Sequence, residues 1–128
     1  MTSPAPTSLN YRRSSRLLEV QFPDTGLTVI SAELLRVMSP SAEVQGHGPG
    51  QETLQTGKAT VDIIGIEPIG HYAVQISFDD GHSSGLYTWA YLAHLAANKT
   101  SLWQHYLRRL EQAGASRDPD IDAVTIIE

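Results

Sequence analysis

The chain has 128 residues, of which 9 are lysine or arginine and 14 are aspartate or glutamate, giving a formal net charge of −5. This acidic balance argues against a general nucleic-acid binder and against attraction to anionic membranes. The absence of cysteine excludes disulfides, a thiolate nucleophile, and zinc or iron–sulfur centres ligated by cysteines of this chain alone. No apolar run approaches the roughly 20 residues of a membrane span. The first residues also lack the apolar segment of a secretory signal, so we expect a cytoplasmic protein.

The ends of the chain differ in composition from its middle. The first ten residues are rich in Ser, Thr and Pro and offer little to bury. We therefore expect a disordered leader over residues 1–14, one domain over residues 15–114 and a flexible tail over residues 115–128. The tail contains an apolar stretch at residues 124–127, and the sequence leaves open whether this stretch docks onto the domain.

Two strands and a short helix are predicted early in the domain. Apolar and polar residues alternate over residues 18–22, which is typical of a half-buried strand, and a second strand follows over residues 27–30. Ser31 is a good N-cap for a helix over residues 32–38. A long irregular connection over residues 39–57 comes next, and its length favours a functional or mobile loop.

Strand signals resume in the middle of the chain. A strand is predicted over residues 60–66, and the clearest alternation of the whole sequence lies at residues 72–78. Asp80 and Gly81 follow, a dipeptide that predicts a two-residue hairpin because a type I′ turn needs positive φ at both central positions.

Two helices are predicted after this turn. Thr88 is placed as the N-cap of the first, and Ser101 with Gln104 three residues later forms a capping box that starts the second. Gly114 is placed to end that helix. The sequence thus predicts an α+β domain, in which helices pack on a small antiparallel β-sheet of about five strands.

The hairpin carries the strongest candidates for a metal site. Asp79, Asp80 and His82, with His47 or Glu43 brought in from the long connection, supply the oxygen and imidazole ligands that suit iron, manganese or zinc. The alternative is that Asp80 belongs to the turn while Asp79 and His82 pair across it. Acidic hairpins are common and convergent ligand sets are rare, so we expect no tightly bound metal.

Catalytic signals are weak throughout the sequence. None of the serines sits in a Gly-x-Ser-x-Gly turn between a strand and a helix, and no convincing acid–base pair or cofactor motif is present. We therefore expect no cofactor, and a role without catalysis is favoured over an enzyme.

Two blocks of the sequence resemble a known family. LLRVMSPSAEVQGHG at residues 34–48 and FDDGHSSGLYTW at residues 78–89 together resemble small bacterial proteins of the DUF971 family. That family corresponds to the N-terminal domain of gamma-butyrobetaine hydroxylase and trimethyllysine hydroxylase. The resemblance covers about residues 14–114 and identifies the chain as a stand-alone member.

The resemblance implies a place for a zinc site, and it also implies that the site is lost. In the hydroxylases this domain resembles a zinc-binding accessory module with three cysteines and one histidine. The corresponding positions here are Ser39, Ser41, Val44 and His82, and hydroxyl groups and a valine do not replace thiolates around zinc. The resemblance covers only the accessory module, so we do not expect hydroxylation of carnitine precursors.

The same resemblance suggests a partner. A similar domain occurs at the C-terminal end of some iron–sulfur scaffold ATPases of the Mrp type, which suggests an adaptor in iron–sulfur protein maturation. We expect the polar side chains of the long connection and the hairpin to form one face that docks a partner protein. These residues are Arg36, Glu43, His47, Asp79, Asp80 and His82. Two alternatives stay open: the residues only tie the connection to the hairpin, or the Asp-Gly-His hairpin binds iron or zinc weakly.

Overall fold

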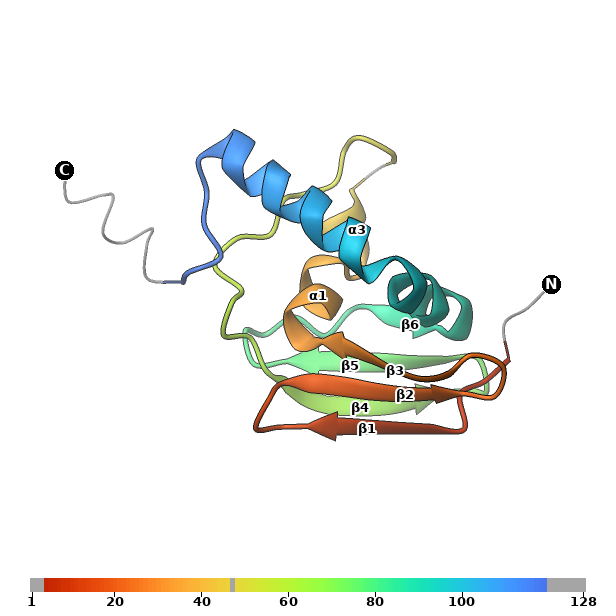
Figure 1. Ribbon diagram of the computed structural model, residues 1–128. Helices are drawn as coiled ribbons and strands as arrows, with labels where there is room; N and C mark the ends of the chain where they lie inside the picture. Colours follow the sequence, from red (N-terminus) through yellow and green to blue (C-terminus); the bar gives the residue numbers. More distant parts are fainter. Residues whose placement is uncertain (1–3, 47, 120–128) are drawn as a thin grey trace.

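The computed structural model describes residues 4–46 and 48–119. In chain order its elements are β1 (Ser8–Arg12), β2 (Leu17–Phe22), β3 (Gly26–Ser31), α1 (Ala32–Val37), α2 (Ala42–Gln45), β4 (Ile63–Ile69), β5 (Ala73–Phe78), β6 (Leu86–Thr88) and α3 (Trp89–Ala113). The strands form two antiparallel three-stranded sheets, ordered β1-β2-β3 and β4-β5-β6. The strands lie together on one side of the molecule, and α1 and α3 lie on the other (Figure 1). The α+β class is confirmed, although the strands form two small sheets in place of one with about five strands.

The first sheet includes a strand that the sequence did not reveal. β1 pairs with β2 from Ser8 opposite Gln21 to Arg12 opposite Leu17, so the expected leader is wrong at these residues. β1 is polar and only its Leu9 and Tyr11 turn inward, which leaves too few apolar positions for a periodicity signal. The strand forms because β2 offers it an edge.

The second sheet is centred on the most regular alternation in the chain. β5 pairs with β4 on one side and with β6 on the other. The strand expected at residues 60–66 begins later and runs through Pro68. Proline is tolerated there because β4 is an edge strand of its sheet. A register shift between Ile63 and Gly65 marks a β-bulge near its start.

The turn after β5 lies where the sequence placed it but has another geometry. The Gly81 N–H donates to the Phe78 carbonyl at 3.1 Å, and the Phe78 N–H donates to the His82 carbonyl at 2.8 Å. Gly81 has a φ of 92°, whereas Asp80 does not have positive φ. This is a three-residue connection, a type I turn followed by a bulged glycine, and the predicted type I′ turn is wrong. Beyond this turn the two segments separate, and the pairing of β5 with β6 begins at Gln75 opposite Leu86.

Helix α1 is the most enclosed element of the fold. The Ser31 hydroxyl caps it by accepting from the Leu34 N–H at 3.0 Å, which confirms the predicted N-cap. All six of its residues are buried, including Glu33 and Arg36, and it lies between the strands and α3 (Figure 1). Two buried charges on so short a helix need counterions from elsewhere in the chain.

Helix α3 consists of two helical segments that join at a kink. Thr88 caps it through the Tyr91 N–H at 3.1 Å, and Gly114 ends it in the left-handed conformation, as the sequence predicted. Asn98 is non-helical inside it, so the break falls three residues before the predicted capping box. The predicted second helix is therefore present and begins directly after Asn98. The Ser101 hydroxyl donates to the Asn98 carbonyl at 3.1 Å, so Ser101 is not its N-cap, and this part of the prediction is wrong.

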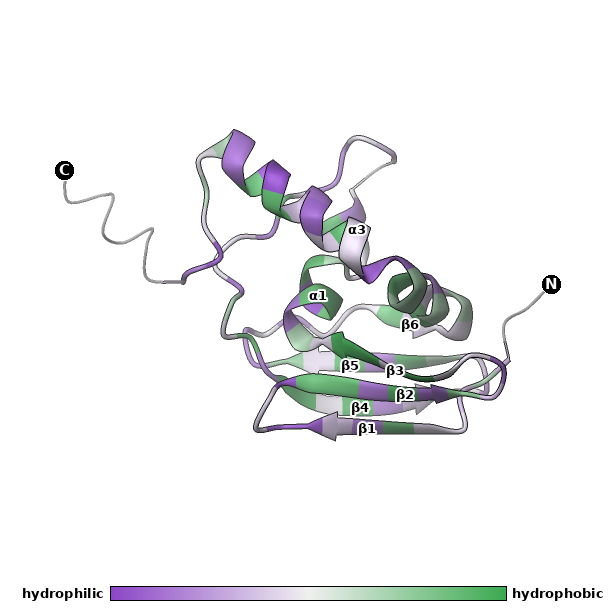
Figure 2. Cartoon of the chain, viewed as in Figure 1, coloured by the Kyte–Doolittle hydropathy of each residue, from purple (hydrophilic) through white to green (hydrophobic). Residues whose placement is uncertain are grey.

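The composition of α3 matches its position on the outside of the domain. Hydrophilic and hydrophobic stretches alternate along it (Figure 2), as expected for a helix that buries one face. None of the helices within residues 4–46 and 48–119 combines the length and apolar composition that a membrane crossing needs.

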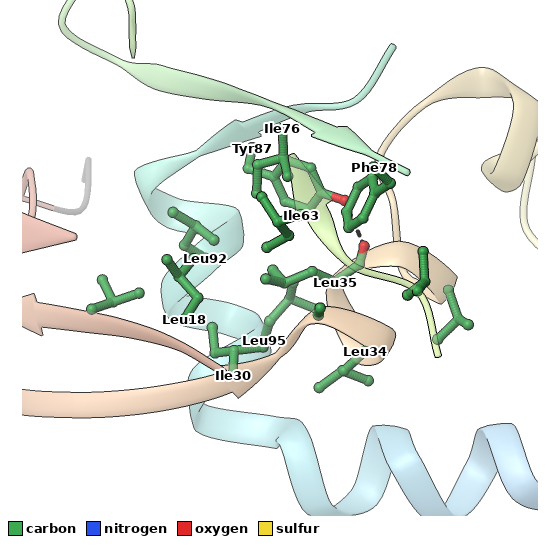
Figure 3. Packing of buried hydrophobic residues seen from close by; sticks show 14 of the residues in the cluster. Leu18, Ile30, Leu34, Leu35, Ile63, Ile76, Phe78, Tyr87, Leu92 and Leu95 are labelled. Atoms are coloured by element: carbon green, nitrogen blue, oxygen red, sulfur yellow. Dashed lines mark hydrogen bonds between the residues drawn. The ribbon is translucent and has the colours of Figure 1, made fainter. Parts of the chain in front are cut away.

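One hydrophobic core joins the two sheets to the helices. Its fully buried side chains come from β2, β3, α1, β4, β5, β6 and α3, among them Leu18, Ile30, Leu35, Ile63, Ile76 and Leu95 (Figure 3). Tyr87 is also fully buried, and its hydroxyl donates to the Leu35 carbonyl. The Tyr91 hydroxyl donates to the Met38 carbonyl in the same way. These two tyrosines thus satisfy carbonyl groups at the C-terminal end of α1 that have no partner within the helix.

The first residues of the expected flexible tail are held against the domain. The Gly57 N–H donates to the Ser116 carbonyl and the Ala59 N–H to the Arg117 carbonyl, each at 2.9 Å. The Arg117 guanidinium binds both carboxylate oxygens of buried Glu33, at 2.7 and 2.8 Å. The tail prediction is therefore wrong for residues 115–119, and the apolar stretch at residues 124–127 lies outside the described residues.

We predict that Arg117→Ala lowers the free energy of unfolding by about 2 kcal/mol, because it leaves the Glu33 carboxylate buried without a counterion. The substitution also removes a guanidinium that lies 5.0 Å from the centre of the Trp103 ring. Urea denaturation followed by circular dichroism measures the change. Arg108→Ala, at an exposed position of α3, is the matched control, and equal losses in the two variants would contradict the prediction. Adding Glu33→Gln to Arg117→Ala should restore part of the loss.

Candidate functional site

The candidate site lies where two loops meet beside α1. One loop follows α1 and includes α2, and the other connects β5 to β6. Side chains pair between them across more than forty residues of sequence: Ser39 with His82, Ser41 with Ser84, and Ser84 with Glu43. The expectation that the long connection is irregular is wrong at α2, whose N-cap is Ser41.

The hydrogen bonds around His82 have one consistent direction. Its Nδ1 lies 3.2 Å from Glu43 Oε1, so this nitrogen carries the proton of the neutral ring and donates to the carboxylate. Its Nε2 lies 2.8 Å from Ser39 Oγ and accepts from that hydroxyl. Ser39 Oγ accepts in turn from the Ser41 N–H at 3.2 Å. Both ring nitrogens of a nearly buried histidine are therefore used.

The two remaining serines close the same network. Ser84 Oγ donates to Glu43 Oε1 at 2.7 Å and lies 2.7 Å from Ser41 Oγ, which donates to it. Ser41 Oγ accepts from the Glu43 N–H at 3.2 Å. Each hydroxyl proton then has an acceptor, which the buried members of the network require for stability. The network fixes the relative position of the two loops.

A cluster of three charges lies next to this network. Arg36 Nε and Lys58 Nζ both contact Asp80 Oδ2, at 2.8 and 2.6 Å, and the His82 N–H donates to Asp80 Oδ1 at 3.1 Å. Burial raises the pKa of the Asp80 carboxyl, but the hydrogen bonds from Lys58, the His82 backbone and Arg36 outweigh it and lower the pKa to about 2. Asp80 therefore stays ionised and joins α1, the hairpin and the segment before β4.

A cavity of about 330 Å³ opens at this cluster. Arg36, Glu43, Gln55, Asp80, Gly81 and His82 are among the residues that line it. Only 8% of the Arg36 side chain is exposed, and its Nη1 is buried without a hydrogen-bond partner among the described residues. The Glu43 side chain, in contrast, is 70% exposed at the edge of the site.

The structure brings four of the six predicted interaction residues together: Arg36, Glu43, Asp80 and His82. Asp79 points elsewhere, because its Oδ1 accepts from the Asp62 N–H at 3.0 Å and its own N–H donates to the Asp62 carbonyl. The alternative cross-strand pair of Asp79 with His82 is therefore wrong. His47 lies outside the described residues.

The candidate metal ligands do not converge on one point. The carboxylate of Asp79 accepts from the backbone just before β4, and that of Asp80 pairs with two cations. The ring of His82 contacts Ser39 and Glu43. Across the described part of the chain, no three side chains of His, Asp or Glu are grouped to hold a metal ion.

The positions that the resemblance assigns to zinc do lie close together. Ser39, Ser41 and His82 belong to one hydrogen-bonded network, and Val44 is buried beside the cavity. In this chain, hydrogen bonds between hydroxyl groups, a carboxylate and a neutral imidazole connect the two loops at these positions.

Ser39, His82 and Glu43 also follow each other in the order of a hydrolase triad. The serine hydroxyl contacts one ring nitrogen and the carboxylate contacts the other. Ser39 is fully buried, however, and a Cβ added at Gly85 would lie 2.5 Å from its Oγ. The Gly85 backbone thus covers the hydroxyl, and no substrate can reach it.

Sequence reasoning missed Lys58, Gln55 and Ser84 as members of the site. Lys58 and Gln55 lie in an irregular stretch without periodicity, and nothing local indicates that they face the hairpin. The sequence did offer a reason to consider Ser84. It lies two residues after the candidate His82, in the block that supports the family resemblance.

Comparison with known proteins connects the fold to a family. The family model described as gamma-butyrobetaine hydroxylase-like, N-terminal, matches residues 9–93. Two solution NMR structures of proteins similar to this chain are 48% and 50% identical to it. They cover 92% and 91% of this chain and 93% and 87% of their own, with TM-scores of 0.81 and 0.79.

A crystal structure of a DUF971-family protein of unknown function from Acidithiobacillus ferrooxidans ATCC 23270 is also similar. It is 37% identical, covers 72% of this chain and 92% of its own, and has a TM-score of 0.61. No curated protein sequence matches the chain.

We predict that Gly85→Ala destabilises the protein by about 2 kcal/mol, because the added methyl group overlaps Ser39 Oγ in a packed region. Thermal and urea denaturation measure the loss. Gly48→Ala is the control, since a Cβ there meets nothing within 4 Å and the change should be small. A fully stable Gly85→Ala protein would show that the backbone does not cover Ser39.

Stability should also fall in mild acid because of His82. Burial and the nearby Arg36 charge lower the pKa of His82, despite the opposing effects of Glu43 and Asp80. The unfolded chain therefore takes up a proton near its ordinary pKa of roughly 6.5, before the folded protein does, so stability falls as the pH drops below that value.

Urea denaturation at pH 7.5 and pH 5.5 tests this expectation. The free energy of unfolding of the His82→Gln protein should depend less on pH than that of the wild type. His105→Gln, at an exposed position of α3, should leave the dependence unchanged. Identical pH dependence in wild type and His82→Gln would refute the role of His82.

Proposed function

Since the chain belongs to the gamma-butyrobetaine hydroxylase-like N-terminal family, also called DUF971, we propose that it is a non-catalytic interaction domain that docks a partner protein. The proposed docking surface is the polar face formed by Arg36, Glu43, Lys58, Asp80 and His82. The observation that carries the proposal is an open cavity whose charged walls are held in place by a buried hydrogen-bond network.

The polar face has the properties of a preorganised binding surface. Its residues come from α1, the α2 loop, the segment before β4 and the hairpin, so the fold places them together. The carboxylate of Glu43 is mostly exposed, and Lys58 and Asp80 are about one-fifth exposed. Because their orientations are set before binding, docking loses little side-chain entropy. Function also tends to lie on loops that a rigid scaffold holds.

The same contacts tie the α2 loop to the hairpin, which was the alternative role for these residues. The hydrogen bonds that join the two loops come from the buried residues Ser39, Ser41 and His82. Glu43 goes beyond this requirement, because it lines the cavity and presents its charge toward solvent. Lys58 lies beside it in the ion pair with Asp80 and keeps about one-fifth of its side chain exposed. A structural role for the buried members and a binding role for the exposed ones are therefore compatible.

The partner we propose is an iron–sulfur scaffold ATPase of the Mrp type, acting in the cytoplasm. The support is the resemblance of this domain to one found at the end of some such ATPases. The chain has no cysteine, so the thiolate ligands of any cluster come from the partner in this proposal. The chain then acts as an adaptor and does not carry the cluster itself.

Isothermal titration calorimetry with the purified Mrp-type ATPase of the same organism tests this function. We expect micromolar affinity, as in transient adaptor complexes, and a loss of about tenfold or more in the Glu43→Gln/Lys58→Gln double variant. Glutamine at residue 43 keeps an oxygen that accepts from His82 and Ser84, and Arg36 remains as a counterion of Asp80, so the double variant should keep its fold, which circular dichroism checks.

The matched control is Glu67→Gln/Lys99→Gln, which makes the same change of charge on β4 and α3. If the control loses as much affinity as the test variant, the polar face is not the docking surface. If the wild type does not bind the ATPase, that partner is wrong. Turnover of a metabolite by the pure protein would contradict the non-catalytic role.

A further inference from the structure

A second cavity, of about 430 Å³, lies between the first sheet and the part of α3 that follows its kink. It shares no lining residue with the polar face. Its apolar walls come from Leu17 on β2, Val29 on β3, Leu34 on α1 and Trp103 on α3. We call this cavity the apolar groove. Apolar surface gathered in one place on a soluble domain is typical of a site that another segment covers.

The sheet side of the apolar groove is made of side chains that the core does not use. Leu17 precedes the fully buried Leu18, and Val29 precedes the fully buried Ile30. Successive side chains of a strand point to opposite faces of the sheet, so Leu17 and Val29 face away from the core. Both are only partly buried. An apolar segment placed over them would remove the rest of this surface from water, which is favourable.

The charge of the apolar groove is positive. Lys99 carries the only charge among the described residues that line it. Its Nζ donates to the Val29 carbonyl at 2.8 Å, and none of the ion pairs among the described residues involves it. Glu19, opposite Val29 on β2, is neutralised by Arg12 at 2.6 Å. An apolar segment that also carries carboxylates therefore complements the groove.

We propose that residues 120–128 of the same chain cover the apolar groove. Their sequence is DIDAVTIIE, which contains three acidic residues, no basic residue and the apolar stretch at residues 124–127. The apolar stretch packs on Trp103 and the sheet, and the Glu128 carboxylate lies near Lys99. The inference is independent of the docking function of the polar face.

The last described residues already lie beside the apolar groove. The Arg117 guanidinium is 5.0 Å from the centre of the Trp103 ring, and Trp103 lines the groove. Nine residues follow Pro119 in the sequence, and an extended chain of that length spans about 30 Å. Trp103 and Lys99 are about one turn of α3 apart, roughly 6 Å along the helix axis. The segment is therefore long enough to cross the groove.

A larger cavity, of about 590 Å³, lies closer to the end of the described chain but fits this segment less well. Residues 115–119 themselves form part of its wall. Its charged lining residues are Glu111, Arg117 and Asp118, whose charges sum to a negative value and repel an acidic segment. Arg117 also already binds both carboxylate oxygens of Glu33. The apolar groove is therefore the favoured place for residues 120–128.

Paramagnetic NMR of the full ¹⁵N-labelled chain tests the inference. The chain has no cysteine, so Ala123→Cys provides a single attachment site for a nitroxide spin label just before the apolar stretch. The same sample with the nitroxide reduced is the reference. Apart from residues close to the label in the sequence, we expect the largest losses of signal at the amides of Val29 and Thr100 and at the indole N–H of Trp103.

The apolar contact is tested by adding Val124→Ser/Ile126→Ser/Ile127→Ser to the labelled chain. This triple variant removes most of the apolar surface of the segment, so the groove signals should recover nearly the intensity of the reduced sample. Thr125→Ser is the matched control, since it changes the same stretch by only one methyl group. It should leave the losses in place.

The contribution of charge is tested on the groove itself. Lys99→Gln should lower the ratio of docked to undocked segment by about twofold to fivefold, because an exposed ion pair is lost, and part of the signal should return. Arg108→Gln makes the same change of charge at an exposed position of α3 outside the groove. It should leave the losses unchanged, and equal recovery in the two variants would contradict a specific role for Lys99.

Three further outcomes would overturn the inference. Weak losses spread evenly over the domain would show that residues 120–128 do not dock. Losses centred on Ala59 and Leu107 would place them in the larger cavity. Losses at the groove in an unlabelled ¹⁵N chain mixed with the spin-labelled ¹⁴N chain would show that the occupant comes from a second copy of the protein.

Discussion

The rest of the structure depends on the burial of two opposite charges on one short helix. All six residues of α1 are buried, and two of them are Glu33 and Arg36. A buried ion without a counterion is costly, so each charge requires a partner from a distant part of the chain. Arg117 supplies one from beyond α3, and Asp80 supplies the other from the β5–β6 connection. The two ion pairs that neutralise these charges thus fix two distant segments of the chain against α1.

The candidate site follows from the second of these pairings. Asp80 holds the hairpin against α1, which brings His82 into reach of Ser39 and Glu43. The burial of His82 keeps its ring neutral, since burial lowers its pKa, and a neutral ring can donate through one nitrogen and accept through the other. A charged imidazole would donate from both nitrogens, so it could no longer accept the hydrogen bond from the Ser39 hydroxyl. The state of the histidine and the direction of the network are therefore linked.

The same arrangement of two loops can be held either by zinc ligands or by hydrogen bonds. The family resemblance places zinc ligands at positions that are occupied here by two serines, a valine and His82, and the structure brings these four positions together. Hydroxyl groups bind zinc poorly but form hydrogen bonds readily. The two loops are joined by hydrogen bonds among Ser39, Ser41, Glu43, His82 and Ser84.

Local patterns in the sequence determined several elements of this protein. The alternation in residues 18–22 and 72–78 gave β2 and β5, and Ser31, Thr88 and Gly114 gave three helix ends. These features depend on side chains within a few positions of each other, which a sequence shows directly. The two sequence blocks at residues 34–48 and 78–89 also carried enough detail to identify the family.

Only the tertiary structure decided which charges meet. β1 forms because β2 offers it an edge. The Asp80 turn takes its type I geometry where two other segments, through Arg36 and Lys58, and the His82 N–H of the hairpin itself hold the carboxylate. Arg36 meets Asp80 across 44 positions and Glu33 meets Arg117 across 84. No local periodicity encodes such pairs, because their energy depends on burial and distance in the folded chain. For that reason the sequence indicated that Arg36 and Asp80 matter, while the fold alone showed that they share one site with Lys58.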